Sequence, residues 1–147
     1  MKSELKNIEL GIGIGSLKFG MLPNQVIEIL GEPDERMKEE YSKEDSDFFS
    51  EEWHYDEIEL SVSFDMLDKL VLSTISISSN EFLLNNKALI GMKREQVEQI
   101  LKEMGINSRW EEFKEIDLNS DLISNEEEGL SLWFEKGKLK EVQWENN

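Results

Sequence analysis

Apolar residues recur at helical spacing in two segments, 22–30 and 97–104, which predicts two short helices with one apolar face each. A shared motif opens both helices. Gly-Met-x-x-x-Gln-Val-x-x-Ile-Leu starts at Gly20 and again at Gly91, and six of the eleven positions are identical in the two copies. A glycine follows each segment and ends the helix. Because such a helix buries its apolar face only against another element, we expect both helices to pack on a sheet.

After each predicted helix, apolar and polar residues alternate with a period of two, which predicts antiparallel strands. The segment 60–65 reads Leu-Ser-Val-Ser-Phe-Asp, and the segment 130–135 reads Leu-Ser-Leu-Trp-Phe-Glu. Their apolar positions should face the helices, and the segments 75–78 and 142–144 show the same division. The side chains expected on the opposite, open face are those of Ser61, Ser63, Ser131 and Trp133.

These matches predict an α+β fold made of two tandem repeats within a single domain, residues 1–147. Repeat one covers about residues 16–79, and repeat two covers about residues 87–145. A second match, of Lys69-Leu70 with Lys138-Leu139, extends the similarity beyond the hairpin turns. Each repeat is expected to be a short helix packed on an antiparallel sheet, and the repeats are expected to share one open sheet face.

The other segments carry weaker patterns. Residues 53–56 alternate aromatic and polar side chains, which predicts one more strand in the first repeat. Residues 10–15 alternate apolar residues with glycine, which predicts an N-terminal arm or an edge strand. The charged segments 36–50 and 119–128 are expected to be charged loops or loosely held strands, and they are assigned no firm structure.

Acidic residues are concentrated in two windows of the chain. The formal net charge is −17. Residues 32–59 hold 13 acids and 3 bases, and residues 111–128 hold 8 acids and 1 base, so these two windows account for the whole net charge. Both windows lie between a predicted helix and its closing hairpin. Such charge argues against binding nucleic acid through phosphates and favours a basic protein partner. The alternative is a solvated surface that keeps the protein soluble.

Several classes of site and location are disfavoured by what the chain lacks. It has no cysteine, so disulfides, thiolate metal sites and lipid attachment through cysteine are excluded. The first residues carry acids where a signal peptide needs an apolar stretch, and the apolar runs are far shorter than a membrane span. We therefore expect a cytoplasmic protein.

Two features suggest chemistry, and both have plainer interpretations. Gly11, Gly13 and Gly15 give G-x-G-x-G, which lacks the spacing of a dinucleotide-binding loop and is more typical of a strand with a bare face. His54 precedes Asp56 by two residues and could serve as a base with an orienting carboxylate. No nucleophile motif accompanies it, and a lone histidine among aromatic residues is usually structural. We expect no cofactor and no metal.

A calcium-binding loop over residues 117–128 is a further alternative. Leu122 stands where such a loop needs glycine, and a predicted strand follows where the exit helix should begin. In a chain this acidic the spacing arises easily. Whether calcium orders this segment is left open. The residues at loop positions 1, 3, 5, 9 and 12 are Asp117, Asn119, Asp121, Asn125 and Glu128.

Trp133 is the strongest candidate for a binding residue, because its counterpart in the first repeat is Ser63 and its alternation points it away from the helices. A tryptophan exposed among small polar residues is typical of an interface hot spot. The alternative is that a loop or the N-terminal arm covers it. The residues expected to contact a partner are Trp133, Ser61, Ser63, Ser131, Asp45, Asp47, Glu51, Glu52, Glu126, Glu127 and Glu128.

The repeated motif, with Gly31-x-Pro33 after its first copy and a later Leu-x-Val-x-Phe strand, resembles a known fold. It resembles the tandem helix-plus-sheet repeat of β-lactamase inhibitory protein and of the small outer-membrane assembly lipoproteins, over about residues 16–145. In the inhibitory protein the combined sheet makes a concave face that grips the target enzyme. Without a signal peptide or a lipidated cysteine, a cytoplasmic use of such a face is expected. The chain then looks similar to immunity proteins, which silence a toxin, often a basic nuclease.

The resemblance and the charge together predict a non-enzymatic inhibitor or immunity-type protein that binds a basic protein partner. A cytoplasmic chaperone or assembly adaptor is the alternative, and an enzyme that uses His54 is a third possibility.

Overall fold

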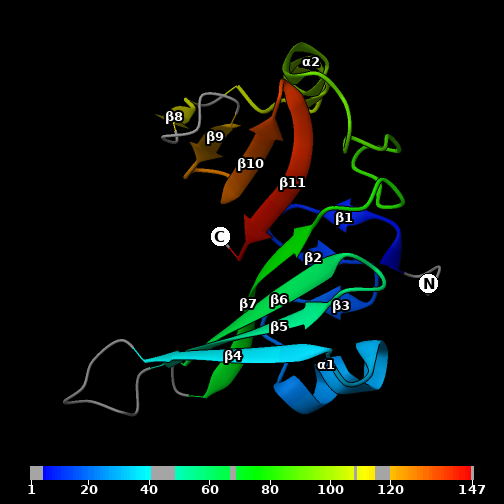
Figure 1. Ribbon diagram of the computed structural model, residues 1–147, viewed down its shortest axis with the longest axis vertical. Coiled ribbons are helices and arrows are strands. Elements are labelled where there is room, and N and C mark those ends of the chain that lie inside the picture. Colours follow the sequence, from blue (N-terminus) through cyan, green and yellow to red (C-terminus); the bar gives the residue numbers. More distant parts are fainter. Residues whose placement is uncertain (1–4, 41–48, 67–68, 108, 115–119, 147) are drawn as a thin grey trace.

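The computed structural model describes residues 5–40, 49–66, 69–107, 109–114 and 120–146, and it is a mixed α+β fold with two helices and two antiparallel sheets (Figure 1). The predicted α+β class is confirmed. The elements in chain order are β1 (Ile8–Glu9), β2 (Gly13–Ile14), β3 (Leu17–Lys18), α1 (Pro23–Leu30), β4 (Glu35–Glu40), β5 (Phe49–Tyr55), β6 (Leu60–Met66), β7 (Leu70–Ile77), α2 (Arg94–Glu103), β8 (Glu111–Lys114), β9 (Ser120–Asn125), β10 (Leu130–Glu135) and β11 (Lys138–Glu145).

One large sheet has eight strands in the order β4-β5-β6-β7-β11-β10-β9-β8. A helix followed by four strands occurs twice along the chain, and we call α1 with β4–β7 the first half and α2 with β8–β11 the second half. The last strand of each half, β7 or β11, pairs with the other at the centre of the sheet (Figure 1). The edges are β4 and β8.

The repeated Gly-Met pair ties each helix to the last strand of its own half. Gly20 donates its backbone N–H to the carbonyl of Leu72 (2.8 Å), and Leu72 donates to the carbonyl of Met21 (2.9 Å). In the second half, Gly91 and Leu139 make the first of these bonds at 2.8 Å, and the second runs to the next methionine at 2.9 Å. Both glycines have positive φ, +91° and +94°, which a residue with a side chain rarely adopts.

The repeated glutamine caps each helix in the same way. The backbone N–H of Leu22 donates to Oε1 of Gln25 (2.8 Å), and that of Lys93 donates to Oε1 of Gln96 (3.1 Å). This bond satisfies a donor at the helix start, and it is the returning half of a capping box. The motif therefore determines how the helix begins in both halves.

One predicted match between the halves is wrong by register. Leu139, rather than matching Leu70, occupies the place of Leu72: it pairs with Phe134 as Leu72 pairs with Phe64. Leu72 follows Phe64 by eight positions, whereas Leu139 follows Phe134 by five. The first hairpin continues for two strand pairs beyond Phe64, whereas the second continues for one beyond Phe134, and an alignment of Lys-Leu pairs does not account for this difference.

With this register the two halves are related by an approximate two-fold rotation through the centre of the sheet. Ile75 pairs with Trp144 across the β7–β11 junction, and Ile77 pairs with Val142. Each pair maps onto the other when the halves are exchanged. The axis passes between Ser76 and Gln143, which are partners of one another.

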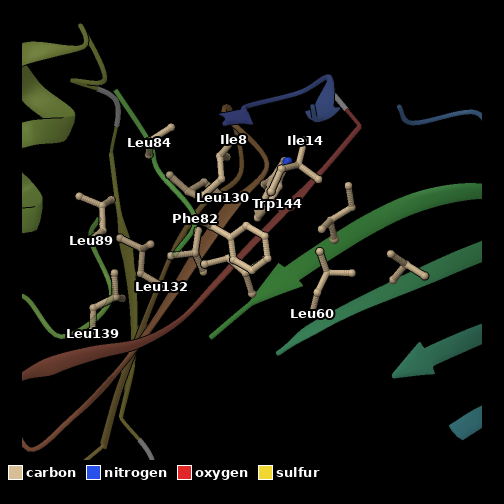
Figure 2. Packing of buried hydrophobic residues seen from close by; sticks show 14 of the residues in the cluster. Ile8, Ile14, Leu60, Phe82, Leu84, Leu89, Leu130, Leu132, Leu139 and Trp144 are labelled. Carbon is tan, nitrogen blue, oxygen red and sulfur yellow. The ribbon is translucent and has the colours of Figure 1, made fainter. Parts of the chain in front are cut away.

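A single hydrophobic core lies on one face of the large sheet. Both helices contribute buried residues to it, as do the small sheet and the segment 78–93. Figure 2 shows Ile14 of the small sheet beside Trp144, and Phe82 near Leu60 and Leu130. The helices therefore cover the same face of the sheet, and the other face is left to the polar positions of the strands.

The glycine-rich segment forms a small three-stranded sheet, β1-β2-β3, instead of the predicted arm or edge strand. Gly13 has φ +152°, and a Cβ there would lie 2.0 Å from the carbonyl oxygen of Leu17. The carbonyl of Gly13 accepts the indole N–H of Trp144 (3.1 Å). Close packing accounts for glycine at this position, without a phosphate.

The strands β4 and β9 lie largely in the two charged segments expected to be loops or loosely held strands, and β8 lies in a stretch for which the sequence predicted no element. Every residue of β4 is exposed, so the strand has no hydrophobic alternation for a sequence to show. β8 is the opposite edge, and β9 lies beside it. Charged residues on edge strands prevent pairing with other chains. They also interrupt the alternation of apolar and polar residues by which a strand is recognised in a sequence.

Candidate functional site: the open face of the sheet

The face of the large sheet away from the helices is lined by polar residues, and we call it the open face. One row crosses all eight strands, and its members are half-buried or exposed, whereas the rows on the other face are mostly buried. The structure places the four side chains expected here, Ser61, Ser63, Ser131 and Trp133, on this face, and all four are half-buried. The row consists of Glu35, His54, Ser61, Ser76, Gln143, Ser131, Ser124 and Glu111.

A neighbouring row differs between the two halves. In the first half it is polar except for Met37 and runs from β4 to β7. In the second half the equivalent positions are mostly apolar and run from β8 to β11. Trp133 takes the place of Ser63, since a strand irregularity follows each of them. The two rows are Met37, Glu52, Ser63 and Thr74, and Phe113, Leu122, Trp133 and Glu141.

We call Phe113, Leu122 and Trp133 the apolar row. Phe113 is 48% exposed and Leu122 is half-buried, so the three side chains form a hydrophobic stripe across β8, β9 and β10. Phe113 also lines a shallow depression of ≈ 200 Å³ with Ser131 and Glu126. The stripe is a surface on which a partner's apolar side chain would lose contact with water.

Glu141 stands at the end of this row, as the cross-strand partner of Trp133. Partial burial raises the pKa of its carboxyl group, repulsion by Glu52 raises it further, and a hydrogen bond with Ser76 opposes the shift. No ion pair within the described part of the chain includes Glu141. Its charge is therefore left for solvent or for a partner.

Trp133 differs from the two buried tryptophans in its hydrogen bonding. Trp53 donates its indole N–H to Oε1 of Glu51 (2.7 Å), and Trp144 donates to Gly13. Among the residues that the structure describes, Trp133 has no such acceptor. Its N–H is free to meet a partner's carbonyl oxygen.

The acidic residues expected at the site are distributed over different places. Glu52 lies on the open face, where it lines a depression of ≈ 490 Å³ with Ser63 and Met37. Glu51 lies on the opposite face and accepts the bond from Trp53. Residues 126–128 form the turn between β9 and β10 at one end of the face. Two further residues, Asp45 and Asp47, lie outside the described residues.

His54 lies on the open face, and its contacts differ from those expected. Its Nδ1 is 2.8 Å from Oγ of Ser61, and its Nε2 is 3.8 Å from Oε1 of Glu52. Asp56, the expected orienting carboxylate, uses its backbone N–H to bind Asp34. A serine, a histidine and a carboxylate do come together, but Ser61 is in a central strand paired on both sides. Its neighbouring backbone amides are committed to the sheet and cannot form an oxyanion hole.

The predicted calcium spacing falls on a regular strand where the structure describes it. Asp121 and Asn125 belong to β9, paired with Phe134 and Leu130 of β10. Asn125 is 1% exposed, and its Oδ1 accepts the backbone N–H of Glu128 (3.0 Å), which fixes the turn. Two other expected ligands, Asp117 and Asn119, lie outside the described residues. In the described ranges, no group of three or more His, Cys, Asp or Glu side chains could hold a metal ion.

Within the described residues, neither helix is long and apolar enough to cross a membrane. The chain matches no protein-family model, no curated protein and no solved structure. The resemblance drawn from the repeated motif therefore stays a prediction.

Sequence reasoning missed three residues of this surface. Phe113 and Leu122 lie inside an acidic window, and Leu122 drew notice only as a departure from a calcium loop. Glu141 follows an extra residue, Lys140, at the β10–β11 irregularity, so alternation counted from Leu139 gives its face incorrectly. The pairing register brings these three beside Trp133.

Proposed function

We propose that this protein is a non-enzymatic, protein-binding inhibitor of the immunity type, which neutralises a basic protein partner such as a toxin. The observation that carries the proposal is Trp133: it is half-buried on the open face, has no acceptor within the described chain, and continues a row with Phe113 and Leu122. Aromatic anchors of this kind dominate the binding energy of protein interfaces.

The proposal includes a duplicated architecture. Matched helix-entry contacts at Gly20 and Gly91, and the approximate two-fold rotation between the halves, support two copies of one repeat. This agrees with the resemblance to β-lactamase inhibitory protein and the assembly lipoproteins. In the inhibitory protein the sheet face grips the target, and here the equivalent surface would be the open face.

Charge supports a basic partner over a neutral one. The chain carries −17, and Glu52, Glu111 and Glu141 lie on the open face itself. A field of one sign attracts a partner of the opposite sign and speeds association, most strongly at low salt. We place this encounter in the cytoplasm, in keeping with the expectation from the sequence.

An assembly adaptor is the second candidate, because Phe113 (48%) and Met37 (52%) expose apolar surface in both halves of the face. An adaptor would bind several unrelated apolar partners with little dependence on salt. An inhibitor would bind one basic partner, and its affinity would fall as salt screens the carboxylates.

The test is affinity capture of a partner from native lysate, followed by purification and titration calorimetry. We expect affinity to fall at least about tenfold between about 50 mM and 500 mM salt, because charge contacts are screened over a few ångströms at high salt. Trp133→Ala should weaken binding at least about tenfold, as loss of an interface anchor does. One equivalent of the chain should also suppress the partner's activity.

The matched control is Ile12→Ala, which removes an exposed apolar side chain (51%) from the turn before β2. It should leave the affinity unchanged. An affinity that responds neither to salt nor to Trp133→Ala would refute the proposal. Several unrelated partners with salt-insensitive affinity would favour the adaptor instead.

A further inference from the structure

We propose that Trp133 and Glu141 together form a receptor for one arginine side chain of the partner. The arginine would lay its guanidinium group on the indole ring and pair with the carboxylate. This inference rests on the proposed function for the partner's identity, but the receptor is tested separately with a small probe.

The two side chains are neighbours on one face. Trp133 of β10 and Glu141 of β11 are cross-strand partners, and their strands run side by side (Figure 1). Directly opposed residues of an antiparallel pair have Cβ atoms about 5 Å apart, within reach of a single bound group. A cation above the ring therefore has the carboxylate beside it.

The molecule contains the same arrangement with its own arginine. On the other face of the sheet, Cζ of Arg36 lies 4.5 Å from the ring centroid of Trp53, and Nη2 of Arg36 lies 2.6 Å from Oε2 of Glu32. The tryptophan supplies the π-face and the glutamate supplies the charge. On the open face the aromatic ring and the carboxylate are present, and the described chain supplies no cation to Glu141.

The electrostatics of the pair favour a cation from outside. Glu141 is held near Glu52 and is partly desolvated, which raises the pKa of its carboxyl group. An arriving positive charge would stabilise the ionised carboxylate and so offset both effects. Lys140, the extra residue at the strand irregularity, is exposed and makes no ion pair with Glu141.

Arginine fits this pair better than lysine. Its planar guanidinium stacks on an aromatic ring and can donate two parallel hydrogen bonds to a carboxylate, whereas an ammonium is a point charge with a tighter hydration shell. The equivalent positions of the first half are Ser63 and Thr74, which offer neither a ring nor a charge. The receptor therefore belongs to the second half alone.

The experiment uses the full-length ¹⁵N-labelled chain and the tripeptide Ac-Gly-Arg-Gly-NH₂, observed in amide and indole NMR spectra. The indole signal of Trp133 is assigned from its loss in Trp133→Phe. We expect the arginine peptide to shift that signal saturably, with Kd in the range of about 1–10 mM for one ion pair and one cation–π contact. The peptide with citrulline, a neutral isostere, should bind at least about tenfold more weakly.

Variants on β11 supply the matched pair. Glu141→Gln should weaken binding of the arginine peptide at least about fivefold, because it removes the charged partner of the guanidinium group. Glu145→Gln removes one carboxylate from the same strand and face and should have no such effect. The spectra also show whether each variant is folded.

A third peptide carries lysine in place of arginine and should also bind more weakly than the arginine peptide. Three results would overturn the inference: an unmoved Trp133 signal, an equal response to the citrulline or the lysine peptide, or equal weakening by Glu141→Gln and Glu145→Gln. These outcomes are separable from failure of the proposed function. If Trp133→Ala abolishes partner binding while Glu141→Gln has no effect, the inhibitor remains and the arginine receptor fails. If the arginine peptide binds as expected but no basic partner is found, the arginine receptor remains and the proposed inhibitor function fails.

Discussion

The two halves of the large sheet share their framework and differ most in one row of the open face, which is mostly polar in the first half and mostly apolar in the second. Gly20 and Gly91 make the same backbone bonds, and a serine stands at the equivalent positions Ser61 and Ser131. Two residues further along each strand, Ser63 of the first half is replaced by Trp133 in the second. The shared positions hold helices on the sheet. The positions that differ are where we look for function, because the fold does not require tryptophan there.

The largest expected effect separates Trp144 from Trp133, which both lie on strands of the second half. Trp144→Ala removes a fully buried side chain that also donates to Gly13, so unfolding should cost about 3–5 kcal/mol less. Trp133→Ala should lower stability by less than about 1 kcal/mol, since this side chain is half-buried. Urea unfolding measures both changes. A large loss of stability from Trp133→Ala would show that Trp133 belongs to the framework.

A second prediction concerns Tyr55 and its equivalent Asn125, which pair with Leu60 and Leu130 at the same point of each half. The Tyr55 hydroxyl donates to the carbonyl of Gly31 (2.8 Å), and burial raises its pKa from 10.0 to about 12. Above pH 10.0 the unfolded chain loses this proton while the folded chain keeps it. Stability from this group is therefore complete below pH 10.0 and is lost as the pH rises toward about 12.

The full shift of about two pKa units corresponds to at most about 3 kcal/mol, from roughly 1.4 kcal/mol for each unit. Unfolding free energies measured in urea at several alkaline pH values should fall more steeply for the natural chain than for Tyr55→Phe. Asn125 has no titrating group, so Asn125→Ser should keep the steep dependence. Parallel curves for the natural chain and Tyr55→Phe would disprove this role of Tyr55.

The smallest expected effect tests whether the helix caps are equivalent. Gln25→Ala and Gln96→Ala each remove one acceptor of a backbone N–H at a helix start, and each should cost about 1 kcal/mol. The two sites are far apart in the fold, so the double variant should lose the sum of the two. Thermal or urea unfolding measures all three variants. Clearly unequal losses of unfolding free energy would show that the two glutamines do not stabilise their helices equally.

Much of the framework could be predicted because it repeats a local signal. The helices at 23–30 and 94–103 follow from the apolar period and the Gly-Met-x-x-x-Gln motif, and the inner strands follow from alternation. The edge strands were not predicted because water contacts both of their faces, which leaves β4 without an apolar side. The glycine-rich segment was ambiguous, since a bare backbone suits a strand, a turn or a phosphate loop.

The candidate site was predicted in part. Trp133 and the three serines were placed on the open face because alternation fixes the face of a strand residue. Phe113, Leu122 and Glu141 were missed because their neighbours are set by strand pairing. Pairing depends on turn length and on irregularities such as the extra Lys140, and neither leaves a periodic trace.

The sequence by itself determined the two helices, their shared entry motif, the inner strands and the confinement of acidic charge to two windows. These are local properties, since propensity, period and capping involve residues a few positions apart. Only the tertiary structure decided that β7 and β11 meet at an approximate two-fold axis, and that Phe113, Leu122, Trp133 and Glu141 share one row. The physical reason is that a sheet brings together residues remote in the chain, through a register that the whole packed core selects.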